Sequence, residues 1–267
     1  MVMRRSIAAI LLGSVIAFGI ASPLAAAELV GHSAGYSMAL KSAASGSGVA
    51  AVKGAMAYNF ADSCDGWTVE NRTSFTIYYE EGAEVETQWS FLTWEAKDGL
   101  SYRFRVNTVR DGQVIEDLQG IAKLEGKGKK GQVTLTRPKQ MTIDLPPGTL
   151  FPSEHTLRLI EYAQNKGKVF SRVVFDGMSL DSPFELNAII GLAQLPGKNP
   201  PSALLARPGW QVRMAAFPYY SQETTPDYEV SLRYRDNGVA EDIIQDYGNF
   251  AIRATLDKIE AAKKPDC

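Results

Sequence analysis

The sequence has little histidine, little cysteine and no excess of positive charge, and each shortage narrows the possible functions. Only two of the 267 residues are His and two are Cys, which leaves few soft ligands for zinc or haem. Lys and Arg total 28 against 30 for Asp and Glu, so no surplus charge draws the chain onto a phosphate backbone. We therefore expect no metal, no other cofactor and no nucleic-acid partner.

The remaining composition is that of a globular protein. Hydrophobic residues make up 45% of the chain, and it contains 23 Gly and 13 Pro, which is neither disordered nor collagen-like. We find no internal repeat and no interdomain linker. The sequence therefore predicts one domain over residues 28–267.

The first 27 residues have the pattern of a secretory signal peptide. Arg4 and Arg5 precede an apolar run over residues 7–20, and the small residues Ala25 to Ala27 follow. That run is shorter than the roughly 18 to 20 residues that a membrane-spanning helix needs, so an uncleaved anchor is the less favoured alternative. Cleavage would leave 26 basic against 30 acidic residues, a net charge of −4. We expect a periplasmic or otherwise exported protein with no transmembrane segment in its mature chain.

The two cysteines, Cys64 and Cys267, would then lie in an oxidising compartment. An even count of two, with no His nearby in the sequence, favours a single disulfide, and two unpaired thiols are the alternative. Closing so long a loop stabilises a fold by up to ~5 kcal/mol in the chain-entropy model. A bridge would also hold the polar C-terminal segment, which would otherwise fray.

Alternation of apolar and polar residues predicts an antiparallel β protein. Residues 67–79, 100–107 and 228–235 alternate with the period of a half-buried strand. Asp-Gly or Asn-Gly pairs separate such segments at Gly66, Gly99, Gly112, Gly177 and Gly238, where a hairpin needs a positive φ. Further strands are predicted at about residues 52–60, 84–94, 114–124, 132–136, 141–145, 168–175, 184–190, 210–216, 239–245 and 250–259.

One interior helix is predicted, with Ser153 as its N-cap, Glu154 in the first turn and Gly167 at its end. A sheet of a dozen or more strands tends to curl or split. We therefore predict a large antiparallel sheet curled into a β-spiral or broken barrel with its apolar side inward. Such a sheet encloses more space than its own side chains fill, so the helix, a ligand or both would occupy the interior.

Two sequence patterns resemble a catalytic and a phosphate-binding motif, and each lacks residues or neighbouring elements that the motif requires. Residues 31–35 match the nucleophile elbow with Ser33 as nucleophile, but no buried strand precedes them in the mature chain, and His155 is the only later histidine. Residues 126–131 begin like a phosphate loop, but Gln132 and Val133 stand where that motif requires Lys and Ser or Thr. A serine hydrolase is thus a remote alternative, and the lysine-rich segment is expected to be a solvated turn.

The remaining candidate features have ordinary interpretations. Asn71 begins a weak glycosylation pattern inside a predicted strand. The acidic pairs at residues 80–81 and 241–242 are expected at solvated strand edges or turns. Most of the aromatic residues are expected in the core. The proline-rich stretch over residues 195–209 is expected to be a long surface loop, either a plain crossover or, less favoured, a mobile lid or partner contact.

Four segments carry a resemblance to a known family, and none is a catalytic signature. The chain resembles the cell-envelope integrity protein B (EipB) family over essentially the whole mature chain. The resembling segments are residues 62–67 around the first cysteine, 95–99, 145–152 and 175–177, together with a cysteine as the final residue.

The resemblance implies a periplasmic protein of certain Gram-negative bacteria that helps to maintain the envelope. It also implies an antiparallel β-spiral with a disulfide that here would join Cys64 and Cys267, and it supplies no catalytic residues. The family shape is similar to that of periplasmic lipoprotein and lipid carriers, which by itself does not establish a ligand. Our interpretation is a non-enzymatic factor that binds an envelope protein or an apolar ligand, with a lipid or lipoprotein carrier as the alternative.

Overall fold

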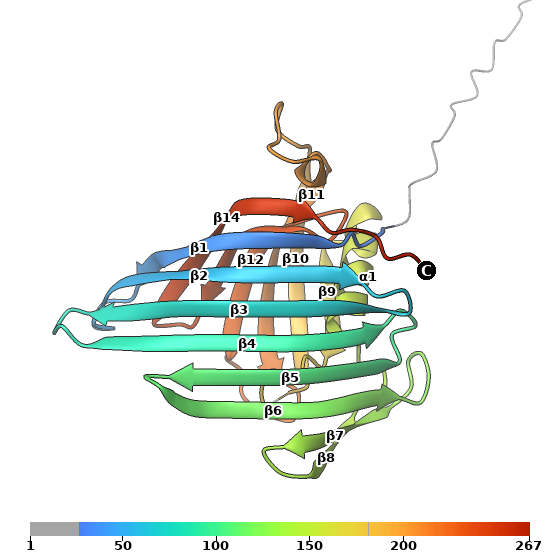
Figure 1. Ribbon diagram of the computed structural model, residues 1–267, viewed down its shortest axis with the longest axis horizontal. Coiled ribbons are helices and arrows are strands. Elements are labelled where there is room, and N and C mark those ends of the chain that lie inside the picture. Colours follow the sequence, from blue (N-terminus) through green and yellow to red (C-terminus); the bar gives the residue numbers. More distant parts are fainter. Residues whose placement is uncertain (1–26, 181) are drawn as a thin grey trace, which may run out of the picture.

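The computed structural model describes residues 27–180 and 182–267, so nearly all of the predicted signal peptide lies outside the described residues. The described strands all belong to one antiparallel sheet of fourteen strands. In Figure 1 the strands β1 to β6 lie side by side across the front, and strands of the second half cross behind them. This curved arrangement confirms the predicted mainly β fold.

The first half of the sheet is a meander in which each strand pairs with the next. Most of its boundaries extend the predicted strands by a few residues, because the alternation continues into the turns. Its strands are β1 (His32–Ala43), β2 (Val49–Asp62), β3 (Gly66–Tyr79), β4 (Glu84–Ala96), β5 (Ser101–Arg110), β6 (Gln113–Leu124), β7 (Gly131–Arg137) and β8 (Met141–Leu145).

The second half is a separate antiparallel meander that follows the helix α1 (Pro152–Gln164). A short 3₁₀ helix, η1 (Ala203–Leu205), interrupts the connection between its second and third strands. The strands are β9 (Val169–Val174), β10 (Phe184–Gln194), β11 (Gly209–Pro218), β12 (Tyr228–Arg235), β13 (Ala240–Asp246) and β14 (Phe250–Ala261).

Pairing of the first strand with the last joins the two halves. Residues of β1 pair on one side with β2 and on the other with β14, so that Tyr36 lies opposite both Met56 and Leu256. No strand is predicted from the sequence at residues 32–43. Strands β8 and β9 stand at the two ends of the strand order, so the sheet stays open, as a broken barrel would.

The hairpin glycines behave as predicted at four of the five turns. Gly99, Gly112, Gly177 and Gly238 all have positive φ values. Gly66 does not: it is the first residue of β3, and the positive φ of that turn belongs to Cys64. A Cβ atom on Gly66 would lie 2.4 Å from the indole nitrogen of Trp94, so glycine is needed there because of close packing.

The helix begins and ends earlier than the sequence predicted. Its N-cap is Phe151 without a side-chain cap, and Pro152 occupies the first turn, where its fixed φ suits a helix and its missing N–H costs nothing. Ser153 is therefore inside the helix. The C-cap is Asn165, and Gly167 only completes the following turn through a hydrogen bond from its amide to the carbonyl of Tyr162.

The helix fills part of the space inside the curved sheet. Phe151, Leu159 and Ile160 are completely buried and belong to the main hydrophobic cluster, together with residues from strands of both halves. A second cluster lies between β1, β2, β3 and β14. The interior of the curved sheet was expected to hold the helix, a ligand or both. The helix does lie there, and the side chains around it are closely packed.

A disulfide joins Cys64 to Cys267, with the sulfur atoms 2.06 Å apart. Cys64 lies in the turn between β2 and β3, and Cys267 ends the tail that follows β14. The amide of Ala262 at the start of this tail donates to the carbonyl of Gly31. The disulfide therefore holds the tail against the end of the sheet where the two halves meet.

Candidate functional site

The residues of the apparent nucleophile elbow lie within the sheet, on opposite faces of β1. Ser33 is exposed and pairs with Asn59 and Glu260, whereas the neighbouring His32 is buried and its Nδ1 lies 2.7 Å from the carbonyl of Val30. A nucleophile elbow requires a sharp turn between strand and helix. Ser33 lies in the middle of a ladder instead, so the segment lacks the geometry of that motif.

The other histidine, His155, is buried on the inner side of α1 against the ring of Phe170. Burial lowers the pKa of its imidazole to about 4, with a further contribution from the charge of Arg172. Its Nε2 atom has no hydrogen-bond partner within the described part of the chain. His155 and Ser33 therefore do not form a base and nucleophile pair, since one is buried beside α1 and the other faces solvent.

The described residues contain no cluster of His, Cys, Asp and Glu side chains that could hold a metal ion. Over the same residues, no helix is both long enough and apolar enough to cross a membrane. The most unusual titratable group is Glu95 of β4, which sequence reasoning did not single out as a functional residue.

Glu95 caps the N-terminus of α1 from a distant strand. Its carboxylate oxygens accept hydrogen bonds from the amides of Ser153 and Glu154, at 2.7 and 2.8 Å. These bonds favour the ionised form, but burial outweighs them and raises the pKa of Glu95 to about 7. Glu95 thus supplies the cap that was predicted for Ser153.

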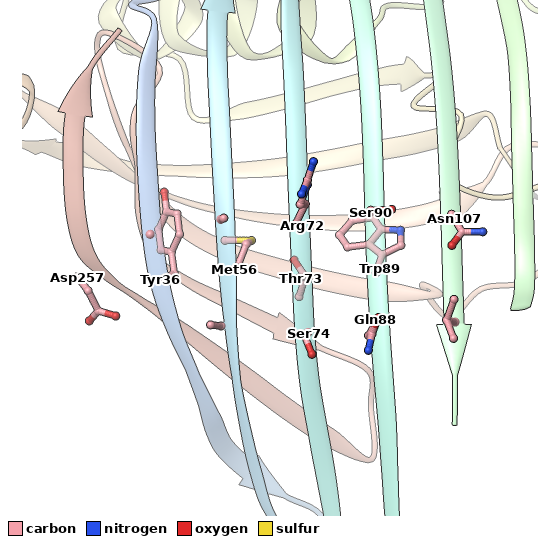
Figure 2. A pocket seen from close by; sticks show the side chains of 14 residues that line it. Tyr36, Met56, Arg72, Thr73, Ser74, Gln88, Trp89, Ser90, Asn107 and Asp257 are labelled. Carbon is pink, nitrogen blue, oxygen red and sulfur yellow. The ribbon is translucent and has the colours of Figure 1, made fainter. Parts of the chain in front are cut away.

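A shallow hollow of about 900 Å³ lies on the exposed face of the sheet, and we call it the outer hollow. Figure 2 looks onto it over strands β14 and β1 to β5. Exposed side chains of small residues such as Ala55, Ala57 and Ser74 leave it open, and Arg72 and Gln88 are among its polar residues. This hollow is open rather than enclosed, and its lining includes apolar residues such as Met56 and Val109 beside the polar ones.

A second hollow, of about 410 Å³, lies beside the end strand β9, and we call it the β9-edge hollow. It is bounded by the turn between β6 and β7, the segment that follows β8, α1 and the strands β9 and β10. Its lining residues are Gly128, Pro147, Gly148, Leu150, Arg158, Ser171, Arg172, Val173 and Glu185. The lysine-rich turn of residues 126–131, expected to be a solvated turn, thus borders a hollow.

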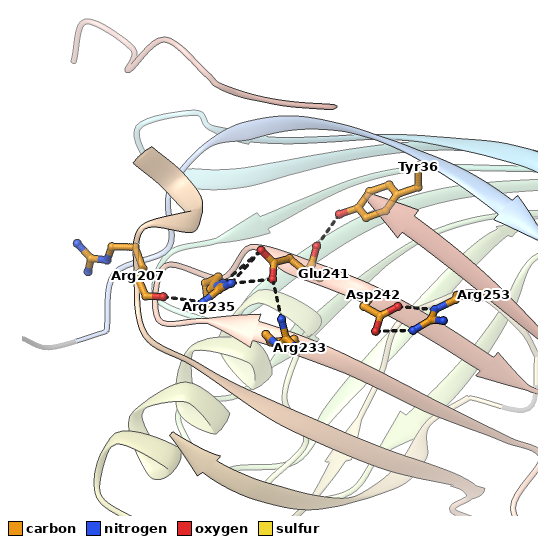
Figure 3. Close-up of polar contacts among 8 residues, drawn as sticks. Tyr36, Arg207, Arg233, Arg235, Glu241, Asp242 and Arg253 are labelled. Carbon is orange, nitrogen blue, oxygen red and sulfur yellow. Dashed lines mark hydrogen bonds and ion pairs between the residues drawn. The ribbon is translucent and has the colours of Figure 1, made fainter. Parts of the chain in front are cut away.

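Within the acidic pair at residues 241–242, Glu241 is largely buried, which corrects the expectation of a solvated edge, whereas the side chain of Asp242 remains 37% exposed. Glu241 lies 2.9 Å from the guanidinium of Arg235 and 3.5 Å from that of Arg233, and Arg253 pairs with Asp242 at 2.6 Å (Figure 3). Strand pairing brings these arginines next to the carboxylates, which the sequence alone does not reveal. The other acidic pair, residues 80–81, is exposed as expected.

The same cluster of ion pairs holds the second part of the proline-rich loop. Arg235 is 6% exposed and also donates to the carbonyl of Arg207 (Figure 3). The side chain of Arg207 pairs with Asp236. Asn237 donates to the carbonyl of Leu204 in η1. These contacts favour the plain connection over a mobile lid for this part of the loop.

Asn71 is buried, and its side-chain oxygen accepts a hydrogen bond from the hydroxyl of Thr73. A buried side chain inside a strand is inaccessible to a glycosylating enzyme, so the glycosylation pattern has a structural explanation. Most of the tryptophans lie in or beside the core as expected, with Trp67 and Trp89 packed against the main cluster.

Comparison with known proteins decides the family. The model of the EipB-like family matches residues 23–263. The chain belongs to the EipB-like family. It is 30% identical over 248 residues to the cell envelope integrity protein EipB of Brucella abortus (strain 2308), covering 91% of this chain and 88% of that protein.

A solved structure agrees with this membership. A β-barrel-like protein from Brucella abortus, described as a domain of unknown function, superposes with a TM-score of 0.80 at 30% identity. The match covers 89% of this chain and all of that one. This EipB-like chain is therefore related to an envelope integrity protein, and its disulfide is consistent with a location outside the cytoplasm.

Proposed function

We propose that this EipB-like protein is exported to the periplasm, loses residues 1–27 and supports envelope integrity as a non-enzymatic binding protein. Its binding partner would be another envelope protein held on an exposed surface of the curved sheet. The single domain over residues 28–267 would be the working unit.

The observation that supports this proposal most is the sequence similarity to an envelope integrity protein. The choice of a protein partner over an apolar ligand is supported by the packing of the interior. Side chains such as Leu159 of α1 and Val212 of β11 are completely buried in the main hydrophobic cluster. The two hollows are open to the surface rather than enclosed, and charged side chains such as Arg72 and Arg158 lie among their mixed lining residues, which suits a protein partner better than an acyl chain.

A complementation experiment tests this role. A strain that lacks the gene is given the full chain, a chain starting at residue 28 without the export signal, or the full chain with Ser33→Ala. We expect the full chain and the Ser33→Ala variant to restore detergent resistance equally, because Ser33 has no catalytic role, and the unexported chain to restore none.

Two results contradict the proposal. Restoration by the unexported chain would place the function in the cytoplasm, and failure of Ser33→Ala at normal protein levels would revive the hydrolase. Native mass spectrometry of protein purified from the periplasm addresses the carrier alternative. Bound lipid in most molecules would favour a carrier, whereas lipid-free protein supports the binding role proposed here.

A further inference from the structure

The strand β9 has a hydrogen-bonded neighbour on one side only. It pairs with β10 through six residue pairs, and it stands last in the strand order. An edge strand presents backbone N–H and C=O groups that another extended chain can use. The unpaired side of β9 borders the β9-edge hollow, which its residues Ser171, Arg172 and Val173 help to line.

The chain itself already makes one rung of a parallel ladder on this edge. Leu150 donates from its amide to the carbonyl of Val173 at 2.9 Å and accepts from the amide of Phe175 at 3.0 Å. The ladder goes no further, because Pro146 and Pro147 have no N–H and Gly148 turns away with a φ of +85°. The edge of β9 is therefore shaped to receive an extended chain in parallel orientation.

The next backbone groups of β9 toward its N-terminal end point to the same side of the strand as Leu150. Successive residues of a strand address opposite neighbours, so the amide of Val173 and the backbone of Ser171 lie on the side of Leu150. Arg172 donates from its guanidinium to the carbonyl of Ser171 at 2.6 Å. This side chain occupies the position that a donor from an added strand would take.

The surroundings of this edge are positively charged. Lys127 and Lys129 flank Gly128 in the turn beside the hollow and are exposed, and Arg172 is exposed above the ring of Phe170. Among the described residues, none of these three cations forms an ion pair. The nearby carboxylates are engaged, since Glu154 pairs with Arg158 and Glu185 accepts from the hydroxyl of Ser171.

The two faces of β9 differ in character beside the edge. Val169 is exposed on the outer face and lies opposite Ile189 of β10, which is also exposed, whereas Arg172 lies on the other face with Phe170. A chain added here would meet Val169 and Val173 on one face, together with the hydrogen-bonded Ser171 and Glu185, and the cation of Arg172 on the other. Alternating apolar and acidic residues satisfy both faces at once.

We propose that the edge of β9 binds an extended, acidic segment of another envelope protein as an added parallel strand. The segment bonds to the carbonyl of Ser171 and the amide of Val173, and Arg172 turns from the carbonyl of Ser171 to a carboxylate of the partner. This site rests on the proposed binding function and names where and how the partner binds.

The test uses the exported chain and a capped synthetic peptide of about ten residues that alternates valine with glutamate. Bound peptide should slow hydrogen exchange at the amide of Val173 and at no amide of the outer hollow. Val173→Pro removes that amide where no β10 bond depends on it, and should weaken binding about tenfold, the effect of one well-placed hydrogen bond. Lys258→Ala, an exposed position on β14 outside the β9-edge hollow, serves as the control with unchanged affinity.

Two further comparisons keep the test decisive if Val173→Pro fails to fold. With the unmodified protein, the same peptide N-methylated at alternate residues should lose binding, because it cannot form the ladder. A peptide that alternates valine with lysine should bind at least about tenfold more weakly, by the opposite sign of its charge. Equal binding by the N-methylated or lysine peptide, or binding only to vesicles of phosphatidylglycerol, would overturn the proposal.

The same variant separates this site from the general function. If Val173→Pro restores detergent resistance as fully as the original chain, the β9 site fails while the envelope role stands. If the original chain itself restores nothing, the envelope role fails. Loss of resistance with Val173→Pro but not with Lys258→Ala supports both.

Discussion

At the scale of single residues, Glu95 links the stability of the helix to pH. It is buried, its pKa is raised to about 7, and it accepts two hydrogen bonds from the first turn of α1. A carboxyl group whose pKa is raised in the folded state stabilises the fold below its unfolded pKa of 4.5, and this contribution is lost as the pH rises to about 7.

Replacing Glu95 by Gln removes this titration and tests the assignment. We expect the unfolding free energy of the original protein, relative to the Glu95→Gln variant, to fall by about 1–3 kcal/mol between pH 4.5 and pH 8. Denaturant unfolding at several pH values measures this difference. His155, whose pKa is lowered by burial, affects the stability with the opposite pH dependence, but it is present in both proteins, so its contribution cancels in the comparison. A difference that stays constant with pH would show that Glu95 does not titrate there.

Sequence reasoning could not identify this cap, because its acceptor lies 58 residues from its donor. A local pattern favoured Ser153, which is a common capping residue type, but the helix starts at Pro152 and its N-cap, Phe151, lies two residues earlier. The same limit explains residues 241–242. Arg235, the partner of Glu241, is close in sequence, but only the folded structure shows that this pair is largely buried.

At the scale of elements, strands with clear alternation were predictable and β1 was not. The strand Met141–Leu145 and the strand Tyr228–Arg235 have their predicted bounds. β1 escaped prediction because small and polar residues such as Gly35 and Ser37 weaken its alternation, and because its pairing with β14 joins opposite ends of the chain. Neither hollow could be predicted, since each depends on several strands or turns distant in sequence.

The cluster around Arg235 is the element-scale contact that should matter most for stability. Removing Arg235 leaves Glu241, among the described residues, with only its longer contact to Arg233, and breaking a buried ion pair costs up to about 3–5 kcal/mol. We expect Arg235→Ala to lower the unfolding free energy by this amount and to speed proteolysis within residues 195–209, which Arg235 anchors. Denaturant unfolding and limited proteolysis measure the two effects.

Lys258 provides the matched control, because its ion pair with Glu260 is largely exposed. Such surface pairs contribute about 0–1 kcal/mol, so Lys258→Ala should leave both measurements nearly unchanged. Equal effects of the two substitutions would mean that the contacts of Arg235 do not hold the loop.

At the scale of the whole molecule, one strand pairing and one disulfide join two meanders. The pairing of β1 with β14 links them, and the bridge from Cys64 to Cys267 closes a separation of 203 residues at the same end of the sheet. The predicted broken barrel follows from strand number and alternation. Which strands remain at the ends could not be predicted, because that depends on how far the sheet curls.

Substituting both cysteines tests the contribution of the bridge. We expect Cys64→Ser with Cys267→Ser to lower the unfolding free energy by up to about 5 kcal/mol, mainly because the unfolded chain gains freedom. Hydrogen exchange should speed in residues 262–267 and at the adjoining end of β14, while β6 and β7 stay protected. Unchanged stability would mean that the tail is held without the disulfide.

The central claim is that this EipB-like protein works by holding an envelope protein at the open edge of its sheet. Photocrosslinking in living cells tests this most directly, with a photoreactive amino acid in place of Val169 beside that edge. The account predicts an adduct with an envelope protein that becomes about tenfold weaker when Val173→Pro is added, as expected for loss of one ladder hydrogen bond. An adduct that is insensitive to Val173→Pro, or one formed with lipid alone, would contradict it.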